Sequence, residues 1–168
     1  MILMLSQRKL EKIKDKLRTV SKNSRVYIGC DSSRKRRQGD GQRMANYSTA
    51  VVIHKIDENG IGRGCNLFIT NEQEVDHDQN PSKPFQRMMN ETYKVVEAYQ
   101  QLEDVLKEHQ VEIHLDLNDD KTQGSNCARN AAVGYVKGVT GIQPETKPES
   151  WAASHAADRG TRGGVDYG

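Results

Sequence analysis

The chain has 168 residues, of which 35 % are hydrophobic and 29 % charged, and its formal net charge is +2. This length favours one domain with a modest core, and because no window reaches the roughly 18 apolar residues of a membrane span, we expect no transmembrane helix. Three widely separated cysteines argue against a disulfide framework, and the start Met1–Leu5 lacks the features of a signal peptide, so we expect a cytoplasmic protein.

The first predicted element is a basic amphipathic helix over residues 6–22. Its apolar stripe recurs at steps of three and four: Leu10, Ile13, Leu17 and Val20. Residues 1–43 hold 13 Lys/Arg against 4 Asp/Glu, a net charge of +9, whereas residues 44–168 hold 12 against 19, a net charge of −7. The basic part of the chain predicts attraction to a polyanion.

Three strands are predicted next, joined by a loop and a tight turn. A mostly apolar run at 25–31 predicts a buried strand, and the polar basic run at 32–43 predicts an exposed loop. Residues 45–57 and 61–71 predict two further strands, with a hairpin turn at Glu58-Asn59-Gly60 because Asn-Gly tolerates positive φ. Short connections between consecutive strands predict an antiparallel meander.

The second half of the chain is predicted to alternate helices and strands. The expected elements, in order, are a loop at 72–83, a long helix at 84–109, a strand at 111–118, a helix at 125–138, a short fifth strand at Gly141-Ile142-Gln143 and a last helix at 148–159. The strand at 111–118 alternates strictly between apolar and polar residues. Small alanines in the last helix predict a close approach to the sheet, and the glycine-rich end is expected to be loose.

Two aspartates are predicted to lie side by side. A strand, a helix and a parallel return strand form a right-handed crossover, which places residues 111–118 beside residues 25–31. Asp31 and Asp116 then sit near the carboxyl ends of neighbouring strands, where ligand sites of open α/β sheets occur. The alternative for Asp31 is a turn-forming role with Ser32, and the alternative for Asp116 is a solvated strand face.

Two further carboxylates are candidates for the same site. Glu91 lies in line with the apolar stripe of the long helix, and Asp158 shares a face of the last helix with Trp151 and His155. Glu91 could instead occupy a boundary position, and Asp158 an ordinary surface position. Four converging carboxylates would repel one another unless cations were bound, and hard divalent cations prefer oxygen ligands.

The chain resembles the YkuK-like family of the ribonuclease-H-like superfamily. The matching strings run in order through residues 25–159: YIGCDSS, YSTAVVIHK, Glu91-Thr92, IHLDLN, GYVKG and KPESWAASHAAD. The resemblance implies an α/β fold in which helices flank a five-stranded mixed sheet, with three antiparallel and two parallel strands. We therefore expect three regions: an extra N-terminal basic helix over residues 1–24, a ribonuclease-H-like domain over 25–160 and a flexible tail over 161–168.

The resemblance also implies a metal site, but it does not imply a substrate. Its metal-binding acids correspond to Asp31, Glu91, Asp116 and Asp158, which would hold two Mg²⁺ or Mn²⁺ ions. Auxiliary roles are expected for His155, Asn118 and Ser32. The expected activity is a two-metal-ion nuclease acting on nucleic-acid phosphodiester bonds, and the alternative is a catalytically silent module that binds nucleic acid or protein.

Basic side chains are the expected contacts to nucleic acid. They are Arg34, Lys35, Arg36, Arg37, Arg43, Lys137 and Lys147. Contacts of this kind to phosphates give affinity without a choice of sequence, and the basic loop could instead serve only solubility. The nucleic-acid type is left open, we expect no membrane partner, and a homo-oligomer is compatible with the sequence.

Overall fold

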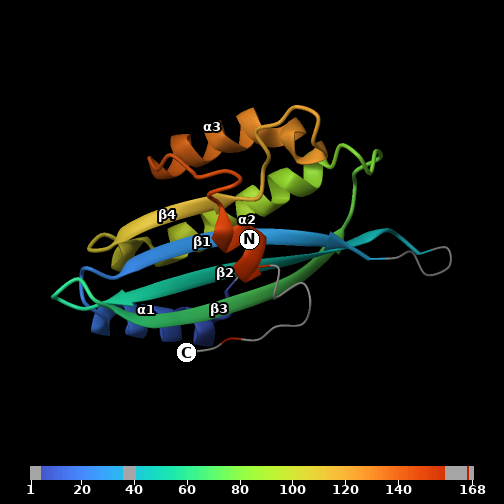
Figure 1. The fold of residues 1–168 in the computed structure, drawn as a ribbon. Coiled ribbons are helices and arrows are strands. Elements are labelled where there is room, and N and C mark those ends of the chain that lie inside the picture. The colour runs from blue at the N-terminus through green and yellow to red at the C-terminus, as the bar shows by residue number, and fades with distance from the viewer. Residues whose placement is uncertain (1–4, 36–40, 158–165, 167–168) are drawn as a thin grey trace.

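The described residues form a four-stranded mixed sheet with three helices and two short helical segments (Figure 1). A computed structural model describes residues 5–35, 41–157 and 166. In chain order the elements are α1 (Gln7–Thr19), β1 (Arg25–Arg34), β2 (Met44–Ile56), β3 (Gly62–Val75), α2 (Phe85–Leu106), β4 (Gln110–Leu115), the 3-10 segment η1 (Gly124–Ala128), α3 (Arg129–Thr140) and the π-helical segment η2 (Ala152–Ala157).

The strands are arranged in the order β3-β2-β1-β4. The first three form an antiparallel meander, and β4 returns parallel to β1 after the crossover through α2. The Asn59-Gly60 turn is present, with Gly60 at φ 80° and its N–H donating to Asp57 O over 3.0 Å. The predicted meander and parallel return strand are therefore confirmed.

The predicted fifth strand at residues 141–143 is wrong. Gly141 adopts φ 73° and ends α3, and the following segment makes an isolated parallel bridge between Glu145 and His114. Pro144 and Pro148 flank this bridge. Because proline has no N–H for a ladder, the segment follows β4 without becoming a regular strand.

The first and third strands of the meander are longer than predicted. β1 continues through Arg34, which pairs with Ala45, and β3 continues through Val75, which pairs with Met44. The end of β1 is anchored within the protein, since Arg34 Nε lies 2.5 Å from Asp76 Oδ2. Residues 32–34 are thus strand, whereas the sequence pattern predicted an exposed loop.

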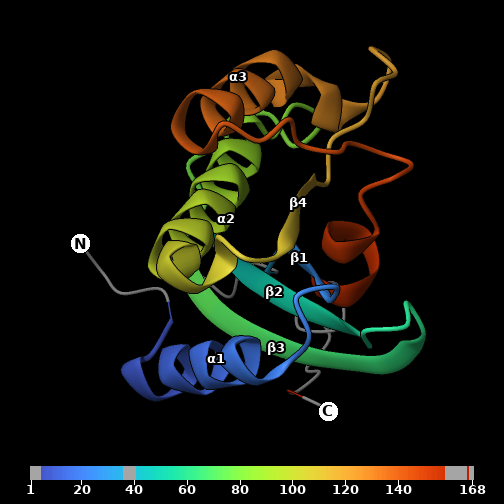
Figure 2. The same ribbon diagram turned by 90° about the vertical axis from the view of Figure 1, so that its left-hand side faces the viewer.

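Helices cover one face of the sheet and η2 covers the other (Figure 2). On the first face, Leu10, Ile13 and Leu17 of α1 pack with α2 residues against β1, β2 and β3. On the opposite face, a smaller cluster joins Tyr27, Ala50 and Val52 to alanines of η2. Each strand of the meander is therefore buried between two layers, as its apolar runs require.

The N-terminus of the long helix α2 is capped by Asp78, which lies in the loop before the helix. Asp78 accepts hydrogen bonds from the Gln86 and Arg87 N–H groups at 2.8 and 2.9 Å. These are two of the N–H groups that an α-helix leaves without an intrahelical partner. No described helix is long and apolar enough to cross a membrane.

Candidate functional site

Asp31 and Asp116 leave adjacent parallel strands at the same level of the sheet. The register pairs Cys30 of β1 with Leu115, the last residue of β4, so Asp31 is the next residue of β1 and Asp116 is the first residue after β4. Both side chains are partly buried. The structure therefore brings together the two backbone positions that the strand order predicted to be neighbours.

Glu91 reaches the same region from α2. The residue is only 4 % exposed, and its Oε1 accepts a hydrogen bond from the Ser32 hydroxyl. Burial of the Glu91 carboxyl, together with the nearby charges of Asp31 and Asp116, raises its pKa well above the ordinary value, while Ser32 and Arg87 act in the opposite direction. Carboxylates from β1, from α2 and from the residue after β4 thus lie close enough for the two aspartates to influence Glu91.

Arg87 supports this arrangement and was not predicted from the sequence. Its Nη1 donates to the Ser32 carbonyl at 3.1 Å and lies 3.3 Å from the Ser32 hydroxyl. Arg87 precedes Glu91 by four residues, which places both on one face of α2. That spacing was the available sequence signal, and it links a cation to the buried acid through Ser32.

Lys147 supplies a second cation at the site. Its Nζ lies 2.9 Å from Asp116 Oδ1, and the side chains are 37 % and 17 % exposed respectively. The Lys147 N–H also donates to Leu117 O at 2.9 Å, so the backbone beside β4 holds this lysine in place. The predicted phosphate-binding lysine therefore contacts a predicted metal ligand.

The donor set suits a hard divalent cation, because carboxylate oxygens are the ligands such ions prefer. Among the described residues, however, no three His, Cys, Asp or Glu side chains are gathered into a metal-binding group. Asp158, the fourth predicted ligand, lies outside the described residues. Asp31, Glu91 and Asp116 therefore match the ion in chemical type, although the described side chains are not gathered into a metal-binding group.

The three predicted auxiliary residues lie in different environments. Ser32 contacts Glu91 directly, as described above. Asn118 shapes the loop after β4: its N–H donates to Ser125 Oγ at 3.2 Å, and its carbonyl accepts from Asn126 Nδ2 at 2.7 Å. His155 is exposed on η2.

The predicted basic contacts do not form one cluster. Arg34 pairs with Asp76, whose side chain is 1 % exposed. The Arg43 carbonyl accepts from the Asp76 N–H at 2.8 Å, which ties this segment to the same acid. Lys35 is exposed beside β1, Lys137 is exposed on α3, and Arg36 and Arg37 lie outside the described part of the chain.

The face of the sheet opposite α2 is organised around His114. Its Nδ1 accepts from the Ala152 N–H at 3.0 Å, and its Nε2 lies 3.1 Å from Glu112 Oε2. Burial lowers the pKa of His114, with Glu112 opposing that shift. A neutral imidazole that donates through Nε2 satisfies both contacts, so His114 holds η2 on the sheet.

A glycine makes this close packing feasible. A Cβ on Gly29 would lie 2.5 Å from Ala153 N and 2.7 Å from Ala152 C. Ala152, Ala153 and Ala157 are fully buried, which confirms the predicted close approach of the small residues to the sheet. Trp151 stacks at the same place, 4.6 Å from the Tyr27 ring.

The sequence of this chain matches a known protein family over most of its length. The family model described as Ribonuclease H-like matches residues 8–162. Comparisons with curated proteins and with solved structures find no match. The family match spans most of the chain and agrees with the resemblance to YkuK-like proteins, so the chain belongs to the Ribonuclease H-like family.

Proposed function

We propose that this protein is a divalent-metal-dependent nuclease that hydrolyses nucleic-acid phosphodiester bonds. The observation that carries the proposal is the burial of Glu91 beside Asp31 and Asp116. A buried carboxylate next to two others is unfavourable unless a cation compensates it. Perturbed acids of this kind are characteristic of functional sites, and the family match supports a fold related to nucleic acids.

Asp31, Glu91 and Asp116 would hold the metal, with Asp158 as a fourth ligand. Two Mg²⁺ or Mn²⁺ ions, when bound, supply activation of a water and stabilisation of the leaving oxygen. Asp31 on β1 and Asp116 directly after β4 would bind the metal from the sheet. Ser32 and Arg87 orient the Glu91 carboxylate, and Lys147 neutralises charge beside Asp116.

A second candidate function is a catalytically silent module that binds nucleic acid. The observation that favours it is the ion pair between Lys147 and Asp116 at 2.9 Å. A lysine ammonium there compensates the carboxylate without a divalent ion. Ser32 and Arg87 likewise lower the pKa of Glu91 without one. A module of this kind binds nucleic acid in a salt-dependent manner and cleaves none.

The two functions are separated by a cleavage assay on the full chain. Wild type and Asp31→Asn are incubated with Mg²⁺ or Mn²⁺ and labelled RNA, DNA, hybrid and branched substrates. Asp120→Asn is the matched control, because Asp120 lies in an exposed loop and bonds to Thr122. The nuclease proposal requires cleavage by wild type and the control and a loss of at least about 100-fold in Asp31→Asn. Equal cleavage by wild type and Asp31→Asn contradicts the assigned site, and binding without cleavage favours the silent module.

A further inference from the structure

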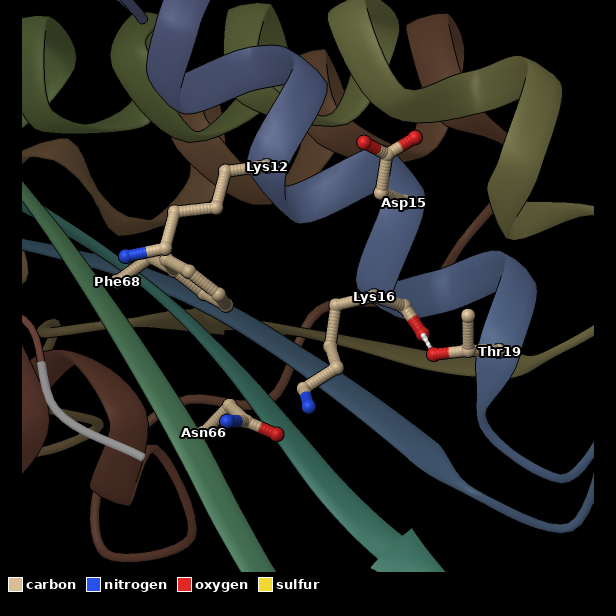
Figure 3. Close-up of a pocket in the computed structure, with 6 residues that line it drawn as sticks. All are labelled: Lys12, Asp15, Lys16, Thr19, Asn66 and Phe68. Atoms are coloured by element: carbon tan, nitrogen blue, oxygen red, sulfur yellow. Dashed lines mark hydrogen bonds between the residues drawn. The ribbon is translucent and has the colours of Figure 1, made fainter.

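A groove runs between α1 and the edge strand β3, and its lining includes none of the residues of the acidic site. Its first part is a depression of about 240 Å³ lined by Ser6, Arg8, Lys9, Lys12 and Asp166. Its second part is a depression of about 300 Å³ lined by Lys12, Asp15, Lys16, Thr19, Asn66 and Phe68 (Figure 3). Lys12 borders both parts, which makes them one continuous surface along the helix.

The cations of α1 are divided between two flanks. On the flank toward α2, Lys14 pairs with Asp104, and near the helix end Arg18 pairs with Asp15 and Lys22 with Glu108. On the flank toward β3, Arg8, Lys12 and Lys16 follow one another at intervals of four residues. Four residues rise about 6 Å along a helix, so these side chains form a row of positive charge.

This row has no acidic partner in the part of the chain that the structure describes. The ion pairs found there include none with Arg8, Lys12 or Lys16. Figure 3 shows Lys12 extending over Phe68 and Lys16 extending toward Asn66. Lys12 Nζ lies 5.9 Å from the Phe68 ring centre, a cation–π contact that leaves its three donors available.

One position in the groove already holds an anionic group. Asp166 Oδ1 lies 3.1 Å from Lys9 Nζ and accepts from the Ile69 N–H at 2.6 Å. Lys9 also donates to the Ile69 carbonyl. A carboxylate held by an ammonium and an edge-strand N–H shows that this part of the groove accommodates an anion.

The groove starts close to the acidic site. The register places Asp31 opposite Ser48 and Ser48 opposite Asn71, two residues beyond Ile69. Two strand spacings amount to roughly 10 Å. The Lys9 end of the groove is therefore the end nearer to the carboxylates, and the row of charge leads away from them.

We infer that this groove between α1 and β3 binds the sugar–phosphate backbone of a nucleic acid. Arg8, Lys12 and Lys16 contact successive phosphates, and Lys9 binds another in competition with Asp166. The inference rests on the proposed action on nucleic acid and adds the surface that holds the strand outside the acidic site. Contacts of this type position the strand without reading its sequence.

The test compares two triple variants of the full chain. The groove variant is Arg8→Gln with Lys12→Gln and Lys16→Gln. The control variant is Lys14→Gln with Arg18→Gln and Lys22→Gln, which removes the same charge from the same region. Thermal melts followed by circular dichroism verify that both variants are folded.

Binding of fluorescein-labelled single-stranded RNA and duplex DNA is measured by anisotropy at several salt concentrations in EDTA. The groove variant is expected to lose about tenfold or more in affinity. Its plot of log affinity against log salt should become shallower, with the magnitude of the slope smaller by roughly 2. The control variant is expected to keep most of the wild-type slope. The probe that binds wild type more tightly identifies the preferred strand form.

Three outcomes overturn the inference: no binding of either probe by wild type, wild-type binding by the groove variant, or equal losses in both variants. Because the assay contains no divalent metal, failure of the nuclease proposal leaves this readout intact. Conversely, failure of groove binding leaves the comparison of Asp31→Asn with wild type in the cleavage assay unchanged. The two proposals can therefore fail separately.

Discussion

Lys147 Nζ lies 2.9 Å from Asp116 Oδ1, where the segment after α3 runs beside the end of β4. Asp116, a proposed metal ligand, is thus already paired with a cation. Both side chains retain some exposure, so the pair is partly screened by water. This contact is the point at which the two candidate functions differ most.

Lys147→Gln is expected to bind Mn²⁺ about fivefold more tightly than wild type. A partly exposed ion pair contributes up to about 1 kcal/mol, and a divalent ion no longer has to displace it. Isothermal titration calorimetry measures the affinity, and Lys137→Gln on the exposed side of α3 is the control. Unchanged or weaker Mn²⁺ binding by Lys147→Gln shows that the lysine does not compete with metal.

Glu91→Gln is expected to stabilise the metal-free protein at neutral pH. The pKa of Glu91 is raised in the folded state, mainly by burial and by Asp31. Its contribution to stability is therefore complete below the unfolded pKa of about 4.3 and is lost as pH rises toward the folded value. The glutamine keeps an acceptor for Ser32 and carries no charge, so the gain is roughly 1–3 kcal/mol.

Urea unfolding in EDTA from about pH 4.5 to pH 8 measures this difference. The gap between Glu91→Gln and wild type should widen as pH rises. Glu103→Gln, at an exposed position of the same helix, should leave the unfolding midpoint close to that of wild type. A constant gap at all pH values would mean that burial of the Glu91 charge is not its cause.

Gly29→Ala is expected to destabilise the protein by about 1–3 kcal/mol. The added Cβ would lie 2.5 Å from Ala153 N, and backbone cannot move aside as a flexible side chain can. Gly134→Ala is the matched control, because no atom lies within 4 Å of a Cβ there. In the helix α3 that change should stabilise by about 0.5–1 kcal/mol. Urea midpoints that move in the same direction for both variants contradict the close packing of η2.

Asp78→Ala is expected to lower stability by about 1–2 kcal/mol, the usual effect of losing a helix cap. The substitution leaves the Gln86 and Arg87 N–H groups without the acceptor they now share. Because Arg87 also holds Ser32, the Mn²⁺ affinity should fall with stability. Asp120→Ala, in an exposed turn, serves as control and should leave the midpoint nearly unchanged. A wild-type midpoint for Asp78→Ala would rule out its role as a cap.

Local patterns predicted most of the elements because their causes are local. The stripe through Leu10, Ile13 and Leu17 predicted α1, and all three residues are buried. Asn59-Gly60 predicted the hairpin turn, and Gly60 has the positive φ that such a turn needs. The predicted fifth strand at Gly141-Ile142-Gln143 was wrong, because Pro144 and Pro148 leave only an isolated bridge at Glu145.

The sequence pattern did not predict which side chains from different segments contact one another. Asp78 caps a helix that begins seven residues later, and Arg34 is paired with Asp76 from the far end of the meander. Arg87 and Lys147 lie beside the acids through folding of α2 and of the segment after α3. These pairings depend on the path of the loops in the folded protein, and the periodicity of apolar residues in the sequence does not predict that path.

By itself the sequence determined the order of strands and helices and hence the neighbouring positions of Asp31 and Asp116. Hydrophobic period and the handedness of the crossover are sufficient for that conclusion. Only the tertiary structure decided that Glu91 is buried within electrostatic reach of both aspartates and that Lys147 reaches Asp116. Burial and charge pairing arise from packing across layers, so they appear only when helices and loops are placed on the sheet.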